Sequence, residues 1–282
     1  MKKIFERLLI FFLGIPLVLA LCTLHFYNYL ALQVASTIFS AIGALELYAI
    51  FSKNYRLLSK PLVVFLSLLL PVSAYFFMAK NFSEHSIALT FFASILILLA
   101  FAVFTLHDFK NANEAIALSV LIVFYCGYLM TFLSRIARFE NATIFLITFF
   151  CMIFLCDSGA WFFGMLFGKK NRGIVKASPN KSIAGFLGGI IGTIVVSLLM
   201  RSFFPNVFHA SIFKTILFAL LISFSAIVGD LIESVFKRSA NVKDSGVLIP
   251  GRGGILDSID SILFSAPVFY FALHFFYKLP LA

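Results

Sequence analysis

Charged residues are scarce in this chain. Asp, Glu, Lys and Arg make up 12% of its 282 residues, only 12 residues are acidic, and hydrophobic residues make up 62%. One soluble core cannot bury that much apolar surface. The scarcity of charge therefore excludes a single soluble domain, and it makes the position of each acidic residue informative.

The cysteine and histidine patterns of common metal sites and disulfide frameworks are also missing. Each of the four cysteines lies in an apolar stretch, and no two of them form a CxxC pair. The five histidines are scattered, without a second ligand at metal-binding spacing. We therefore expect buried thiols rather than disulfides or a cysteine-based metal site.

Long apolar runs are abundant. A helix needs roughly 20 apolar residues to cross a bilayer, and runs of about this length recur along the chain. The predicted spans are 4–24, 29–51, 61–79, 87–106, 114–133, 142–167, 182–204, 212–236 and 259–278. We therefore predict an all-α polytopic membrane protein with about nine transmembrane helices. The first run has no small-residue cleavage site after it, so we expect it to be retained.

The net charge of +10 follows this topology. With the N-terminus inside, 16 of the 22 Lys and Arg residues fall on one side of the membrane and 6 on the other. Such an excess marks the cytoplasmic side, where basic loops meet anionic headgroups or nucleotides. We therefore expect a cytoplasmic N-terminus, contact with membrane lipid, and no nucleic acid partner. A bacterial inner membrane suits the size and the charge pattern.

The chain divides into a quiet and a polar half. We expect residues 1–140 to form an N-terminal scaffold of transmembrane helices, in which Glu46 simply reaches the membrane interface. Residues 141–282 are the expected catalytic transmembrane region, with cytoplasmic loops 168–181 and 237–254. The acids after residue 140 lie in or near apolar spans or in these loops. They are Asp157, Asp230, Glu233, Asp244, Asp257 and Asp260.

Two segments at the start of the polar half are candidates for substrate binding. Asp157 interrupts an apolar span, which indicates either a carboxylate facing a water-filled cavity or a polar kink satisfied by a neighbouring helix. The loop that follows is basic and leads through Ser178, Lys181 and Ser182 into a glycine-rich span. Its Lys and Arg side chains suit phosphate groups near a helix start, although a cytoplasmic loop is also basic for topological reasons.

The densest cluster of polar residues is 234–260, with four basic residues, three aspartates and five glycines or prolines. Asp230 and Glu233 are three residues apart on one helix face, and Asp257 and Asp260 repeat this spacing. Carboxylate pairs at a common depth can hold one or two hard cations such as Mg²⁺, together with substrate phosphates. Gly253 and Gly254 would let backbone N–H groups approach a phosphate. The pattern indicates a magnesium-triphosphate site at a membrane surface.

This cluster resembles the signature of the phosphatidate cytidylyltransferases (CDP-diacylglycerol synthases), S-x-x-K-R-x(4)-K-D-x-G-x(2)-I-P-x-H-G-G-x-x-D-R-x-D. The matching residues are Ser234, Lys237, Arg238, Lys243, Asp244, Gly246, Ile249, Pro250, Gly253, Gly254, Asp257 and Asp260. The segments around Asp157, Ser178 and Asp230 also look like family features. The chain departs from the pattern at three positions, where Arg252 replaces histidine, Ser258 replaces arginine and Ala184 replaces glutamate.

The resemblance implies that CTP and phosphatidic acid give CDP-diacylglycerol and pyrophosphate with Mg²⁺, on the cytoplasmic side. It also suggests a homodimer. The implied metal ligands are Asp230, Asp257 and Asp260. These three aspartates and the side chains of Lys237, Arg238, Lys243 and Asp244 make up the implied catalytic set. The implied substrate-binding residues are Asp157, Ser178, Lys181, Ser182, Ser234, Arg252, Gly253 and Gly254.

Two other functions remain as alternatives. A CTP-dependent lipid-alcohol kinase would also need basic loops and carboxylates in a helical membrane protein, but the contiguous signature favours the cytidylyltransferase. An ion-coupled transporter could use acids within the membrane. It would not explain why acids, glycines and bases gather at one cytoplasmic face, and the halves contain no convincing pair of matching broken helices.

Overall fold

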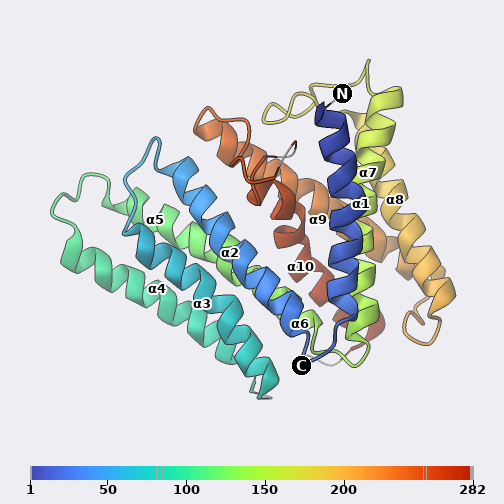
Figure 1. Cartoon of the computed structure of the whole chain (residues 1–282), viewed down its shortest axis with the longest axis horizontal. Helices are drawn as coiled ribbons and strands as arrows, with labels where there is room; N and C mark the ends of the chain where they lie inside the picture. Colours follow the sequence, from blue (N-terminus) through green and yellow to red (C-terminus); the bar gives the residue numbers. More distant parts are fainter. Residues whose placement is uncertain (1, 81, 84, 250, 252, 280–282) are drawn as a thin grey trace. The chain divides into compact units, whose positions relative to one another are not determined.

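The computed structural model describes residues 2–80, 82–83, 85–249, 251 and 253–279, with side chains from residue 12 onward. The described chain is built from helices (Figure 1). It divides into two compact units, which comprise residues 2–138 with 236–259, and residues 139–235 with 260–279. The chain therefore leaves the first unit after residue 138, returns to it for residues 236–259, which contain most of the family signature, and then leaves it again.

The first unit is built from the N-terminal helices. Their order is α1 (Lys2–Thr23), α2 (Leu30–Phe51), α3 (Lys60–Ala79), α4 (His85–Thr105), α5 (Ala112–Ile122), the π-helical turn η1 (Val123–Tyr128) and α6 (Thr131–Ile136). Helix α3 lies between α2 and α4 and also packs on η1 (Figure 1). Ser40 of α2 donates a hydrogen bond to the carbonyl of Ser67 on α3, at 3.1 Å. These contacts hold α2 against its neighbours in this unit.

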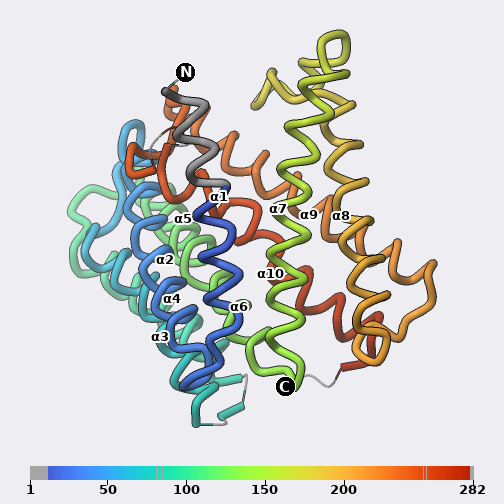
Figure 2. Tube along the Cα trace, turned by 45° about the vertical axis from the view of Figure 1, so that its right-hand side comes forward, coloured from blue at the N-terminus to red at the C-terminus, as the bar shows by residue number. Residues whose placement is uncertain are grey.

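The second unit contains α7 (Ala142–Phe167), α8 (Ile183–Phe203) and parts of α9 (Ile212–Ser239) and α10 (Leu256–Tyr277). Helices α7 and α8 form an antiparallel pair, as Figures 1 and 2 both show. Glycines let the two backbones approach closely. A Cβ atom added to Gly188 would lie 2.5 Å from the carbonyl oxygen of Gly159 and 2.6 Å from Cβ of Phe163. Small residues at such an interface are typical of helix pairs in membranes.

Replacing Gly188 by valine should therefore destabilise the α7–α8 pair. Because the added methyl groups would meet backbone atoms that cannot move aside, we expect a loss of about 1–3 kcal/mol in the free energy of unfolding. The thermal unfolding midpoint of purified protein measures the effect. Leu187→Ala, at an exposed neighbouring position, is the control. Equal midpoints for the wild type and Gly188→Val would contradict the tight packing.

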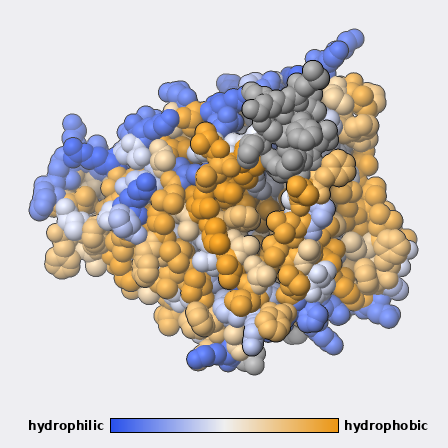
Figure 3. All heavy atoms as spheres, viewed as in Figure 1, coloured by the Kyte–Doolittle hydropathy of each residue, from blue (hydrophilic) through white to orange (hydrophobic). Residues whose placement is uncertain are grey.

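The membrane-protein fold predicted from the apolar runs is confirmed. Within the described residues, eight helical segments are long and apolar enough to cross a membrane, and α1 adds a shorter apolar stretch, Phe12–Thr23. The fourth of these segments, Ala112–Ile136, comprises α5, η1 and α6. Figure 3 shows that hydrophobic side chains dominate the face in view. The four cysteines are free; Cys22, Cys126 and Cys156 are buried and Cys151 is half-buried. The cytoplasmic position of the N-terminus stays a prediction.

Candidate active site

The end of α9 is held in the first unit by contacts with the N-terminal helices. The ring of Phe236 lies edge-on to Phe51 at 5.3 Å and to Tyr125 at 5.5 Å between centroids. Asn54 donates a hydrogen bond to the carbonyl of Ser239 at 2.6 Å. The helix ends directly after this residue, and Asn241 follows with a φ angle of 54°. The scaffold helices thus fix the point from which the next loop begins.

Residues 240–255, which we call the signature loop, connect α9 to α10. Ile249 and Gly253 exchange two backbone hydrogen bonds of 2.7 and 3.0 Å, so the loop folds back on itself. Gly253 has a φ angle of 115°, a conformation that side-chain-bearing residues rarely adopt. The predicted substrate-binding residue Arg252, together with Pro250, lies outside the described residues.

Asp257, in the first turn of α10, is the centre of a polar network. Its Oδ1 lies 2.5 Å from Nζ of Lys237 on α9. Its Oδ2 accepts hydrogen bonds from the backbone N–H groups of Ser245 and Gly254, both at 2.8 Å, and lies 2.9 Å from Oγ of Ser245. The Asp257 side chain is 7% exposed. Charge-assisted bonds of this kind are stronger than neutral ones, so one carboxylate ties the signature loop to both helices.

The remaining predicted residues of this segment lie at the surface. Arg238 is exposed and donates a hydrogen bond to the carbonyl of Val242 at 3.1 Å, just beyond the end of its helix. Lys243 and Asp244 follow and are exposed. The structure therefore brings Lys237, Asp257 and Gly254 together and leaves Lys243 and Asp244 accessible to a ligand.

A second group of predicted residues lies in the second unit, where the α7–α8 loop meets α9. Nζ of Lys181 lies 2.6 Å from Oδ2 of Asp230, in a partly exposed ion pair. The backbone N–H of Gly173 donates to the carbonyl of Lys181 at 3.3 Å, and the N–H of Ile183 donates to the carbonyl of Asn171 at 3.1 Å, which closes the base of this loop. Ser182 is the N-cap of α8, because its Oγ accepts a hydrogen bond from the N–H of Gly185 at 3.0 Å. Ser178 lies in the turn before them, where its carbonyl accepts a bond from Lys181.

Helices α9 and α10 cross where Gly229 meets Asp260, close to further acidic residues of the second unit. A Cβ atom on Gly229 would lie 2.7 Å from the carbonyl oxygen of Asp260, and Ser261 donates a hydrogen bond to Ala226 at 3.1 Å. Asp260 is buried, and its Oδ1 accepts a bond from the N–H of Ser261. Glu233 and Ser234 are buried on α9, while Asp157 on α7 is half-buried. Several carboxylates thus lie near this crossing, and an ionised carboxylate that is buried in a membrane protein is costly unless a positive group or hydrogen bonds offset its charge.

The model of the family described as "Cytidylyltransferase family" matches residues 5–276. The chain belongs to the cytidylyltransferase family.

Curated relatives carry the name phosphatidate cytidylyltransferase. Proteins of this name from Staphylococcus haemolyticus and Staphylococcus epidermidis are 35% and 36% identical to the chain over 171 residues. One from Staphylococcus aureus is 33% identical over the same length. Each match covers 61% of this chain and 63% of the relative, so the chain spans a little under two thirds of the length of these proteins.

The three predicted metal ligands of this cytidylyltransferase-family chain are divided between the two units. Among the described residues, no group of three or more His, Cys, Asp or Glu side chains is placed to hold a metal ion. Asp257 belongs to the first unit, whereas Asp230 and Asp260 belong to the second. Carboxylate oxygens are the ligands Mg²⁺ prefers. At Asp257, however, a cation would compete with the ammonium group of Lys237, which already lies against Oδ1. The joint site therefore stays a prediction.

Sequence reasoning missed two residues of the first unit, Glu46 and Ser245. The expectation that Glu46 reaches the membrane interface is wrong, because its side chain is buried and accepts hydrogen bonds from the segment 245–256. These partners lie about 200 residues further along the chain, so no local pattern could reveal them. The one available signal was a carboxylate inside an apolar span, which is costly unless something satisfies it.

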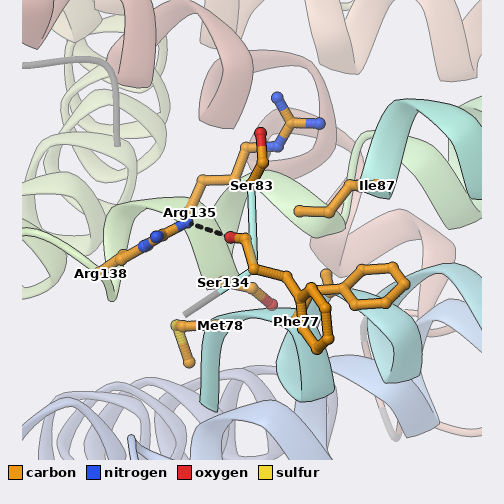
Figure 4. A pocket seen from close by; sticks show the side chains of 9 residues that line it. Phe77, Met78, Ser83, Ile87, Ser134, Arg135 and Arg138 are labelled. Carbon is orange, nitrogen blue, oxygen red and sulfur yellow. Dashed lines mark hydrogen bonds between the residues drawn. The ribbon is translucent and has the colours of Figure 1, made fainter. Parts of the chain in front are cut away.

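A pocket in the described part of the first unit lies elsewhere on the N-terminal helices. Figure 4 shows Arg135 and Arg138 of this pocket with the apolar side chains of Phe77, Met78 and Ile87. Arg138 donates a hydrogen bond to the carbonyl of Phe82 at 3.0 Å. The residues that line it do not include any predicted site residue. The predicted site residues, in the signature loop and on α7, α9 and α10, therefore lie outside this pocket.

Proposed function

We propose that this protein transfers the cytidylyl group of CTP to phosphatidic acid, giving CDP-diacylglycerol and pyrophosphate in phospholipid synthesis. The observation that carries the proposal is the network around Asp257. It holds Lys237 and Gly254 of the family signature, together with Ser245, in one arrangement and leaves Lys243 and Asp244 exposed on the same loop. Membership of the cytidylyltransferase family supports the reaction class.

The chemistry requires positioning more than activation. The phosphate of phosphatidic acid is already an anionic nucleophile, and the difficulty lies in bringing it against the polyanionic triphosphate. An oxygen of the lipid phosphate would attack the α-phosphorus in line, the bond from this phosphorus to the β-bridging oxygen would break, and pyrophosphate would leave. Basic side chains reduce the repulsion between the two anions.

Different residues of this chain would bind the two substrates. Lys243 and Arg238 are exposed on or beside the signature loop and would bind the phosphates of CTP. Lys181, paired with Asp230, would bind the lipid phosphate. Ser178 and Ser182, which are close to Lys181 in the sequence, and Asp157 on α7 would complete this substrate-binding group. Gly253 and Gly254 leave room for a phosphate close to the backbone. Lys237 would hold Asp257 in place and neutralise it.

A magnesium ion is part of the proposal. Asp230 and Asp260, with Asp257 as the third predicted ligand, would hold Mg²⁺, alone or with a second cation. When bound, Mg²⁺ supplies positive charge that neutralises the triphosphate and the departing pyrophosphate. We further propose that the active site faces the cytoplasm at a bacterial inner membrane, as the distribution of basic residues predicts, and that the protein acts as a homodimer.

An assay with purified protein in lipid vesicles tests the function. CTP and phosphatidic acid with Mg²⁺ should yield CDP-diacylglycerol, identified by mass spectrometry. EDTA should abolish product formation and excess Mg²⁺ should restore it, because the Asp carboxylates are negative like the triphosphate and a cation has to neutralise both. Diacylglycerol, which lacks the phosphate, serves as the matched control substrate. Folded protein that yields no CDP-diacylglycerol would overturn the function, and a rate insensitive to EDTA would overturn the role of the metal.

A further inference from the structure

Glu46 of α2 forms hydrogen bonds to the segment that leads into α10. Its Oε2 accepts a bond from the N–H of Leu256 at 2.8 Å, and its Oε1 accepts one from the N–H of Ile255 at 3.0 Å. Leu256 is the first residue of α10. The first N–H groups of a helix lack partners within it and favour a negative charge nearby. Glu46 therefore caps α10 from a helix far away in the sequence.

The same carboxylate is linked to Asp257 through a single hydroxyl group. Oγ of Ser245 lies 2.9 Å from Oε2 of Glu46 and 2.9 Å from Oδ2 of Asp257. A serine hydroxyl has one proton to donate, so the two carboxylates share it. The backbone N–H of Asp257 in turn donates to this oxygen at 3.3 Å. The position of Asp257 is thus tied to that of Glu46.

The backbone of the signature loop is shaped to accept this carboxylate. A Cβ atom on Gly254 would overlap Oε2 of Glu46 and Oγ of Ser245, and a Cβ atom on Gly246 would overlap Oε1 of Glu46. A side chain at either position would therefore displace the Glu46 carboxylate or the Ser245 hydroxyl from this arrangement. These two family-signature glycines are explained by a residue outside the signature.

The partners of Glu46 distinguish a positioning role from a general structural one. Within the described residues, the side-chain hydrogen bonds of Glu46 go to the segment 245–256, although α2 itself packs against α3 and η1. A carboxylate in an apolar helix is costly to bury, by roughly 3 kcal/mol at mid-membrane. Packing within the scaffold alone could be achieved by an apolar side chain at no such cost. We therefore attribute the burial of this carboxylate to its hydrogen bonds with the segment 245–256.

We propose that Glu46 is a positioning residue for cytidylyl transfer, which acts by holding the signature loop and the first turn of α10 in the conformation that presents Asp257, Lys243 and Asp244. The inference rests on the proposed function. Glu46 does not contact the reacting groups itself. It fixes the loop from a helix that belongs to the N-terminal scaffold.

The test compares Glu46→Gln with Glu114→Gln, the same change at an exposed acid near the start of α5. Glutamine has the same shape, but it replaces one acceptor oxygen by a donor group and removes the charge. We expect kcat to fall about 10- to 100-fold, since small misplacements of reacting groups have effects of this size. The KM for CTP should change less than kcat. Glu46→Asp, which keeps the charge, should recover part of the rate.

Hydrogen–deuterium exchange of the full chain gives a readout that does not depend on activity. In Glu46→Gln, exchange should accelerate in residues 245–256 and remain as in the wild type in α3, α7 and α8. Ser245→Ala, which removes the shared hydroxyl, should accelerate exchange in the same segment. Because the two residues act through one network, the double variant should be no slower in catalysis than the slower single variant, within about twofold.

The outcomes separate this inference from the proposed function. Selective loosening of 245–256 with a lower kcat supports it. Wild-type exchange in this segment, or a general increase in exchange through all helices with a lower unfolding midpoint, would overturn it. Lost activity without local loosening would also overturn it. If the wild type itself made no CDP-diacylglycerol, the proposed function would fail, while exchange would still decide whether Glu46 holds the loop.

Discussion

Replacing Asp257 by asparagine is expected to reduce CDP-diacylglycerol formation by about 10³-fold, the size of effect seen when a key electrostatic group is removed from an active site. The carboxylate lies 2.5 Å from Nζ of Lys237 and accepts bonds from Ser245 and Gly254. Asparagine can accept at one atom only, and its NH₂ group would face either the ammonium group or the backbone donors. The signature loop and Lys237 should both lose their positions.

A loss of folding has to be separated from a loss of catalysis in this variant. Removing one partner of a buried ion pair can cost about 3–5 kcal/mol, because the other charge is left unpaired. The double variant Asp257→Asn with Lys237→Met removes both charges and should recover stability. It should not recover activity. A double variant as active as the wild type would contradict a catalytic role for the pair. Asp108→Asn, at an exposed loop position, is the matched control.

Replacing Asp230 by asparagine is expected to lower activity by about 100-fold and to raise the Mg²⁺ concentration that gives half-maximal rate. Asp230 is partly exposed, pairs with Lys181 at 2.6 Å, and follows the glycine at which α9 crosses α10. The substitution removes a hard oxygen ligand and leaves the basic side chain in place. Activity measured across a magnesium titration gives both quantities.

The lysine provides the comparison for this prediction. Lys181→Met removes the partner of Asp230 but no metal ligand, so it should weaken the use of phosphatidic acid and leave the half-maximal Mg²⁺ concentration close to that of the wild type. Asp108→Asn again serves as the control. An unchanged magnesium dependence in Asp230→Asn would remove this residue from the predicted metal site.

The apolar runs predicted the membrane helices well because bilayer thickness sets their length. The predicted spans 142–167 and 29–51 differ by at most one residue from helices α7 and α2. The start of α10 was less predictable. It lies at Leu256 and not at residue 259, because Asp257 and Glu46 accept the N–H groups of Gly254, Ile255 and Leu256. Capping by a distant side chain leaves no trace in the local sequence.

The candidate site was predictable in its residues and less so in its pairings. The spacing of Lys237 and Asp257 matches the family signature, yet their ion pair requires α9 to continue past the predicted end of its span, to Ser239. Helix α9 can do so because Phe236 and Ser239 are held by side chains of the N-terminal helices. The contributions of Glu46 and Ser245 depend on the same long-range packing, which a single sequence does not display.

The fate of the CTP phosphates tests the central claim most directly. Two parallel reactions with phosphatidic acid would use CTP labelled with ³²P at the α- or the γ-position, followed by separation of lipid from soluble products. Cytidylyl transfer predicts that the α-label enters the lipid and the γ-label leaves in pyrophosphate. Transfer of the γ-label to the lipid, with the α-label retained in soluble CDP, would contradict the account and identify a kinase.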